Sequence, residues 1–180
     1  MSRPRRPRLS LGWLVSAADR AGRAALPAAL AVLLMVVAAT PPDLPSAVPA
    51  VAFASVLFWT LFRPAAMGPA VAFGLGLLQD LLTFGPLGAG VLTLLLTHAA
   101  AMRWRRVLAR QSFLVVWLAV AGFAAGAVAV GFALQALLTF AVPPVAPAVQ
   151  LFLLSVGFYP PLALLFTRLH RRLERAEAAA

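Results

Sequence analysis

The sequence predicts an all-α integral membrane protein with six transmembrane helices, and three observations support this. The hydrophobic fraction is 63% and the mean hydropathy is +0.95, whereas soluble domains are roughly 45–50% apolar. No charged side chain occurs between Gln111 and Thr167, although a membrane span needs only about 20 such residues. All 15 basic residues are arginines, and they lie beside the apolar segments rather than within them.

Turn-forming or charged residues divide the apolar sequence into six segments. In chain order, the boundaries are Pro41-Pro42, Arg63-Pro64, Gly85-Pro86, the arginines from Arg103 to Arg110, and Pro143-Pro144. The predicted spans are residues 24–40, 44–62, 65–82, 87–102, 112–142 and 148–167. At about 1.5 Å per residue, the first and fourth are slightly short for a bilayer core of about 30 Å. The fifth is long enough to tilt or kink.

The arginines predict the orientation of these spans. If the N-terminus is cytoplasmic, all of them fall in the N-terminal tail 1–23, the turn at Arg63, the loop 103–111 and the C-terminal tail 168–180. The outer turns hold no arginine and one acid, Asp43. Cytoplasmic loops of membrane proteins carry the excess of positive charge, so we expect both termini inside. Within the tails, we expect a short interfacial helix from Leu9 to Ala18 and a charged helical extension at the C-terminus.

Two alternatives change the number of spans. The first apolar segment follows basic residues and contains small ones, as a signal peptide does, and cleavage would leave five spans. The second contains Pro45 and Pro49 and could enter the membrane and return. Because both prolines lie in the expected first turns, where proline is tolerated, a full span is preferred.

The composition excludes several classes of function. The chain has no cysteine, so it has neither disulfides nor thiolate metal sites, and we expect no cofactor and no metal. No phosphate-binding Gly-Lys-Ser/Thr loop, carboxylate pair or Ser-His-Asp set is present, so the protein is predicted not to be an enzyme. The net charge of +10 is explained by topology and by attraction to anionic lipid rather than by nucleic acid. Few intramembrane charges also argue against a strongly ion-coupled transporter.

Asp80 is the only carboxylate within a predicted span. It lies about 25 Å from Arg63 at helical rise, near the outer boundary and close to the turn Gly85-Pro-Leu-Gly88. Three interpretations remain open. The side chain accepts hydrogen bonds from free N–H groups at the start of the fourth span, or contacts a partner or ligand, or couples to protons.

Other polar and small residues indicate contacts between helices. Five polar side chains fall at a similar depth, and they form either a polar cavity open to the outside or hydrogen bonds between helices; they are Gln79, Thr83, Gln135, Thr139 and Gln150. His98 lies about 15 Å further inward and is expected to be a hydrogen-bonded packing residue. Gly122 and Gly126 form a GxxxG pattern, which packs either internally or against another protein's helix.

The stretch Phe73-Gly-Leu-Gly-Leu-Leu-Gln-Asp80-Leu-Leu, followed by Gly85-Pro-Leu-Gly88, resembles the MreD family of rod shape-determining membrane proteins. The resemblance implies a non-enzymatic, multi-pass inner-membrane subunit of the bacterial cell-wall elongation machinery. Its implied partners are an MreC-like protein, RodA-like and transpeptidase wall-synthesis proteins, membrane lipid and, indirectly, MreB-like filaments.

The same resemblance implies a fold similar to the substrate-binding subunits of energy-coupling-factor transporters. A vitamin-like ligand in a transporter subunit is therefore the alternative function. By the motif, the candidate partner-binding or structural site consists of Gln79, Asp80, Gly85, Pro86 and Gly88.

Overall fold

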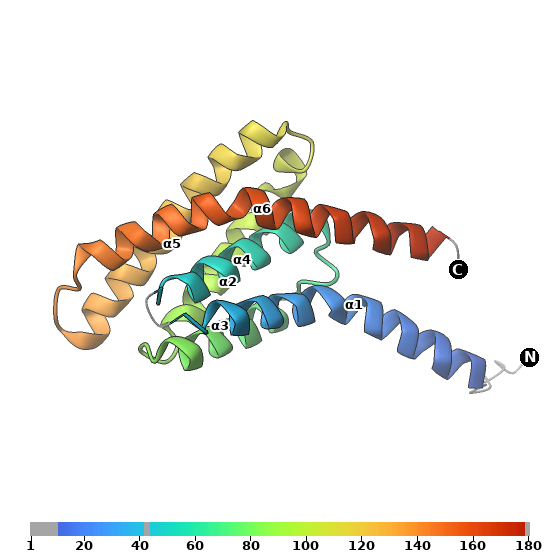
Figure 1. Ribbon diagram of the computed structural model, residues 1–180, viewed down its shortest axis with the longest axis horizontal. Coiled ribbons are helices and arrows are strands. Elements are labelled where there is room, and N and C mark those ends of the chain that lie inside the picture. The colour runs from blue at the N-terminus through green and yellow to red at the C-terminus, as the bar shows by residue number, and fades with distance from the viewer. Residues whose placement is uncertain (1–10, 42–43, 179–180) are drawn as a thin grey trace, which may run out of the picture.

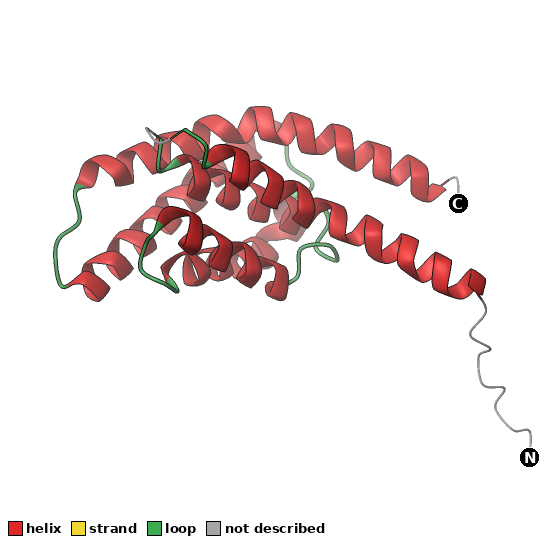
Figure 2. Cartoon of the chain, turned by 60° about the horizontal axis from the view of Figure 1, so that its bottom comes forward, coloured by secondary structure: helices red, strands yellow, loops and turns green. Residues whose placement is uncertain are grey.

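The computed structural model describes residues 11–41 and 44–178, and it places the side chains of residues 25–41 and 44–168. The predicted all-helical class is confirmed, because the described residues form six α-helices joined by turns (Figures 1 and 2). They are α1 Leu11–Ala38, α2 Ala47–Phe62, α3 Pro69–Thr83, α4 Ala89–Leu108, α5 Phe113–Thr139 and α6 Val145–Ala178.

The first and last helices are longer than the predicted spans. α1 begins at Leu11, inside the segment assigned to the N-terminal tail, and continues through Pro27 to Ala38. Most of the expected interfacial helix is therefore continuous with the first apolar segment. α6 runs past Thr167 to Ala178, so the expected helical extension is present. The start of α1 and the end of α6 project from the same end of the bundle (Figure 1).

α2 is the centre of the bundle. Every residue from Ala47 to Leu61 is buried except Pro49, and α2 packs against α1, α3, α4 and α6. The segment considered for re-entry is thus one unbroken helix. α5 lies at the periphery and packs against α4 and α6. The preference for Ala and Val in α2 lets four neighbours surround it, since small side chains permit close helix approach.

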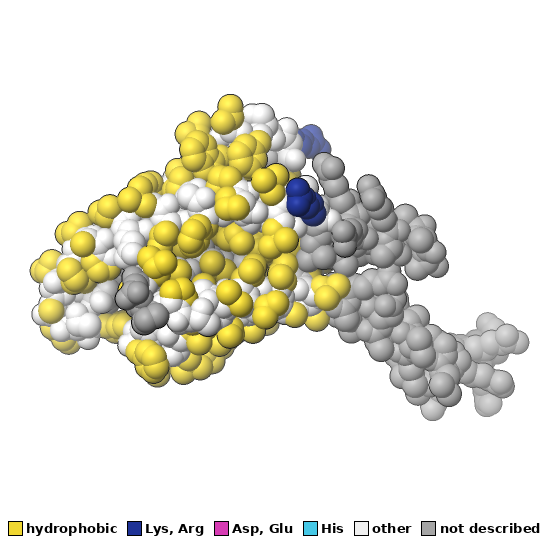
Figure 3. All heavy atoms as spheres, viewed as in Figure 1, with side chains coloured by type: hydrophobic (Ala, Val, Ile, Leu, Met, Phe, Trp, Pro, Cys, Tyr) yellow, Lys and Arg dark blue, Asp and Glu magenta, His cyan; other side chains and the backbone are white. Residues whose placement is uncertain are grey.

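Many large hydrophobic side chains are exposed, as expected of a bundle whose solvent is lipid. Large hydrophobic side chains are exposed on the outer helices (Figure 3), including Leu118 at 67% and Leu164 at 63%. Two stretches of the described residues are long and apolar enough to cross a membrane, Phe113–Thr139 and Val145–Arg168. Three shorter helical stretches are also apolar, Ala25–Ala38, Ala47–Phe62 and Pro69–Thr83.

Toward the C-terminal end of α2, aromatic rings and one polar pair fix the packing. The Phe58 and Trp59 rings lie 5.2 and 5.3 Å from the Phe166 ring of α6, measured between centroids. Thr60 Oγ1 and His98 Nδ1 are hydrogen-bonded at 2.9 Å, joining α2 to α4. His98 is 7% exposed. The prediction of a hydrogen-bonded packing histidine is therefore confirmed.

Candidate functional site

Asp80 joins the end of α3 to the start of α4. Its carboxyl group is 3% exposed and accepts two backbone hydrogen bonds of 2.7 Å, from Gly88 N–H to Oδ2 and from Gly90 N–H to Oδ1. The first N–H groups of a helix have no partner within the helix, so the side chain supplies the missing acceptors. The hydrogen bonding expected of Asp80 is present. Its role in partner binding remains a prediction.

Two glycines let α3 and α4 approach closely enough for this contact. A Cβ at Gly76 would lie 2.5 Å from Val91 Cα and 2.9 Å from Val91 N. A Cβ at Gly90 would overlap the side chains of Asp80 and Gln79. Gly88, the residue before α4, has φ +96°, which a residue with a Cβ adopts only with strain. At these positions α3 and α4 therefore pack closely.

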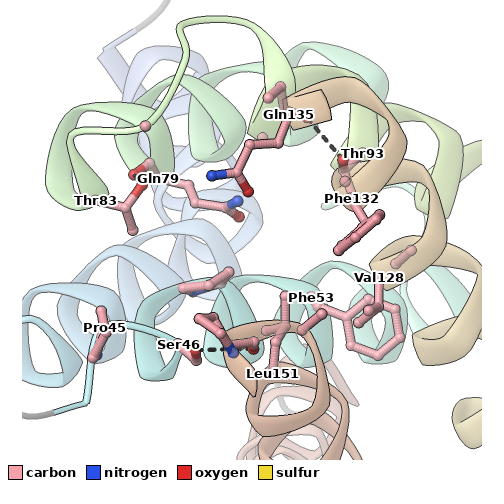
Figure 4. A pocket seen from close by; sticks show the side chains of 18 of the residues that line it. Pro45, Ser46, Phe53, Gln79, Thr83, Thr93, Val128, Phe132, Gln135 and Leu151 are labelled. Carbon is pink, nitrogen blue, oxygen red and sulfur yellow. Dashed lines mark hydrogen bonds between the residues drawn. The ribbon is translucent and has the colours of Figure 1, made fainter. Parts of the chain in front are cut away.

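A cavity of about 320 Å³ opens beside the Asp80 turn. Its lining includes Pro45 before α2, Pro86 before α4, and Pro143 before α6. These three turns therefore lie at one end of the bundle. Side chains of α2 to α6 complete the walls, with Phe53 and Phe132 supplying aromatic surface (Figure 4).

Three of the five expected polar side chains line this cavity, namely Gln79, Thr83 and Gln135. Gln79 extends from α3 and Gln135 from α5 toward the same space (Figure 4). Gln79 Oε1 is buried without a hydrogen-bond partner among the described residues. The other two expected residues do not line it: Thr139 Oγ1 donates to Gln135 O within α5 at 2.7 Å, and Gln150 Oε1 of α6 accepts from Ser46 Oγ, just before α2, at 3.4 Å.

The two glutamines belong to a repeated sequence that the sequence analysis missed. Residues 79–84 read Gln-Asp-Leu-Leu-Thr-Phe, and residues 135–140 read Gln-Ala-Leu-Leu-Thr-Phe. Both copies end a helix identically, because each threonine hydroxyl donates to the glutamine carbonyl and each phenylalanine is left-handed, with φ 51°. The recurrence of five of these six residues in the sequence could have revealed it. It places one carboxamide on each side of the cavity.

The GxxxG pattern is not a contact within the described part of the chain. A Cβ added at Gly122 or Gly126 would meet no atom within 4 Å, and both residues are exposed on α5. Of the two interpretations, packing against another protein's helix is the one that stays a prediction.

The cavity and the turn held by Asp80 lie within a region that matches a known family. The family model for rod shape-determining protein MreD matches residues 24–169. The chain belongs to the MreD family. The resemblance seen in residues 73–88 is therefore confirmed, and membership identifies a membrane protein with a role in rod shape determination. No curated protein matches the chain, and no solved structure does.

The chemistry available at this MreD-family site is that of binding. Within the described ranges, no group of three His, Cys, Asp or Glu side chains is placed to hold a metal ion. Both carboxyl oxygens of Asp80 already accept hydrogen bonds. Apart from this carboxyl group, which also lines the cavity, an occupant meets neutral carboxamides, hydroxyls and apolar surface. These groups suit an uncharged occupant with a few hydrogen-bonding groups.

Proposed function

We propose that the chain is a non-catalytic scaffold subunit of the bacterial cell-wall elongation machinery and partners an MreC-like protein. We further propose six membrane spans, with both termini in the cytoplasm of a bacterial inner membrane. The observation that carries the docking proposal is the cavity beside the Asp80 turn, which combines aromatic walls with two neutral carboxamides.

The positions of the arginines and turns support the proposed topology. The three turns that border the cavity contain no arginine. Arg63 follows α2 and Arg105 lies in the last turn of α4, at the opposite ends of helices whose starts border the cavity. Because positive charge favours the cytoplasmic side, the cavity would face the periplasm. An MreC-like partner would meet it there.

The same cavity supports docking of an uncharged partner segment. Phe84 and Phe140, which end α3 and α5, are 95% and 96% exposed and offer apolar surface at the same end of the bundle. The carboxamides of Gln79 and Gln135 offer hydrogen bonds inside it. Asp80 and the Gly85–Gly88 turn would then act by holding the shape of the mouth, while RodA-like, transpeptidase and MreB-like components would associate through the wider assembly.

The test is affinity purification from native membranes. We expect the wild type to recover an MreC-like protein and a RodA-like protein. A Gln79→Leu/Gln135→Leu variant should lose most of the MreC-like protein, whereas Gln111→Leu, an exposed glutamine after α4, should not. Equal recovery by the two variants would show that the carboxamides do not contact the partner. Reporter fusions that place either terminus in the periplasm would overturn the topology.

The cavity volume favours one second candidate, a subunit that binds a small vitamin-like molecule for a transporter. A volume of about 320 Å³ lies at the lower end of small-molecule sites, which are roughly 300–1,000 Å³. The unpartnered Gln79 Oε1 is an acceptor for such a ligand. Recovery of a pair of ATPases and a coupling subunit in the same purification would favour this candidate.

A further inference from the structure

We propose that the end of α4 opposite the cavity binds the phosphate group of an anionic phospholipid. A groove of about 420 Å³ lies there, lined by Arg105, Arg106, Val107, Ala109 and Arg110. Its walls are therefore three guanidinium groups and two small apolar side chains. This site is independent of the proposed scaffold function, because it uses none of the cavity residues.

The positive charge of the groove is not neutralised by the described side chains. Asp80 is the only carboxylate among them, and it is held by Gly88 and Gly90 at the opposite end of α4. Fifteen residues separate Gly90 from Arg105, which corresponds to roughly 22 Å at helical rise. Among the described side chains, an anion entering the groove therefore meets no competing carboxylate nearby.

The arginines are also not needed to cap the helix. Basic side chains in a last helical turn often stabilise the free carbonyls there. Here the backbone does this, since Ala109 N–H donates to Arg105 O at 2.9 Å and Gln111 N–H to Leu108 O at 3.1 Å. Arg110 N–H donates to Val107 O at 3.3 Å. Within the described part of the chain, no side chain pairs with these guanidinium groups, and their planar donor pairs match phosphate oxygens.

Exposed apolar side chains beside the groove favour the phosphate group of a lipid over free inorganic phosphate. Val107 is 54% exposed and Trp104 is 57% exposed, and residues three apart are neighbours on a helix surface. Tryptophan favours the boundary between acyl chains and headgroups. A phosphodiester held by the arginines would extend its glycerol and acyl chains over this apolar surface. An inorganic anion would make no use of it.

Quenching of Trp104 by brominated lipids tests the site in vesicles. The Trp104 signal is the difference between the wild type and Trp104→Phe, since the chain has 4 tryptophans. We expect brominated phosphatidylglycerol to quench it at about tenfold lower mole fraction than brominated phosphatidylcholine. A basic residue near an anionic membrane contributes a factor of about five, so Arg105→Gln/Arg106→Gln/Arg110→Gln should abolish the preference.

A matched control distinguishes a specific lipid site in the groove from the general effect of positive surface charge. Arg3→Gln/Arg5→Gln/Arg6→Gln removes the same charge from the N-terminal tail and should retain the preference; an equal loss in both triple variants would overturn the proposal. If circular dichroism shows that the groove variant folds poorly, the single variant Arg110→Gln, which lies after α4, replaces it. This variant should weaken the preference for brominated phosphatidylglycerol about fivefold. An unchanged preference would overturn the proposal. Displacement by millimolar glycerol 3-phosphate would also overturn it, because the site would then be one for soluble phosphate.

Discussion

The hairpins α3–α4 and α5–α6 share a repeated sequence, but only α3 and α4 pack closely beside it. In each, the same Gln-x-Leu-Leu-Thr-Phe sequence ends the first helix, and the second helix begins nine residues after its variable position, at Ala89 and at Val145. The α3–α4 hairpin is closed, with Gly76 against the Val91 backbone. At the corresponding places of α5–α6 stand Phe132 and Pro147, and both line the cavity.

Three further replacements explain why only one hairpin closes. Asp80 corresponds to Ala136, so the second turn has no carboxyl acceptor. Gly88, whose N–H donates to Asp80, corresponds to Pro144, which has no N–H. Gly90 corresponds to Ala146. The repeated residues set how each helix ends, whereas the residues that differ decide whether the next helix packs closely or leaves a cavity.

Loss of the Asp80 carboxyl group should have the largest effect on this difference. Asp80→Ala leaves the N–H groups of Gly88 and Gly90 without their acceptor, which should lower the free energy of unfolding by about 2–4 kcal/mol. Rod-shape complementation should fail while membrane insertion persists. Thermal unfolding in detergent, together with complementation of a deletion strain, measures both. Full complementation would show that the capped turn is dispensable for function.

Crowding at the α3–α4 contact should have the next largest effect. Gly76→Ala places a methyl group against the Val91 backbone and should cost about 1–3 kcal/mol. Gly74→Ala, on the same helix with no atom within 4 Å of the added Cβ, is the matched control and should be neutral or slightly stabilising. Equal unfolding midpoints for the two variants would contradict the close approach.

Adding a carboxyl group to the open hairpin should not close it. Ala136→Asp should destabilise the protein by about 1–2 kcal/mol, because an acid within a membrane helix is unfavourable and Pro144 offers no N–H. The double variant Asp80→Ala/Ala136→Asp should be no more stable than Asp80→Ala. Thermal unfolding in detergent measures both; rescue by the second substitution would mean that the two turns are interchangeable.

Loss of the hydroxyl group of Thr83 or Thr139 should have the smallest effect on stability. The two variants compare the ends of α3 and α5 directly. Thr83→Val and Thr139→Val each remove a hydroxyl bond to a glutamine carbonyl, of 2.9 and 2.7 Å. Because both bonds lie within one helix, each loss should change stability by only about 0.5 kcal/mol. We expect the larger change at Thr83, which is half-buried, than at Thr139, which is exposed. A larger change at Thr139 than at Thr83 would indicate that the end of α5 contributes more to stability than the end of α3.

The sequence predicted the helices well where strong local signals bound them. Prolines and arginines placed α2 and α5 within a few residues, and the carboxyl group beside a glycine-rich turn predicted the Asp80 hydrogen bonds as one of three alternatives. The start of α1 was predicted less well, because its arginines resembled a polar tail, whereas the helix already begins at Leu11. The polar cavity was predicted only as one of two alternatives.

Local chemistry by itself determined the membrane class and the ends of α2 and α5, and it offered the acceptor role of Asp80 as one alternative, since each depends on residues close together in the chain. The tertiary structure decided which polar side chains share a cavity, because Gln79 and Gln135 are 56 residues apart and meet only when five helices pack. It also decided that Gly76 and Gly90 form a helix contact, whereas Gly122 and Gly126 form none within the described part of the chain. A missing Cβ permits close approach, but only the arrangement of the neighbouring helices brings a backbone there.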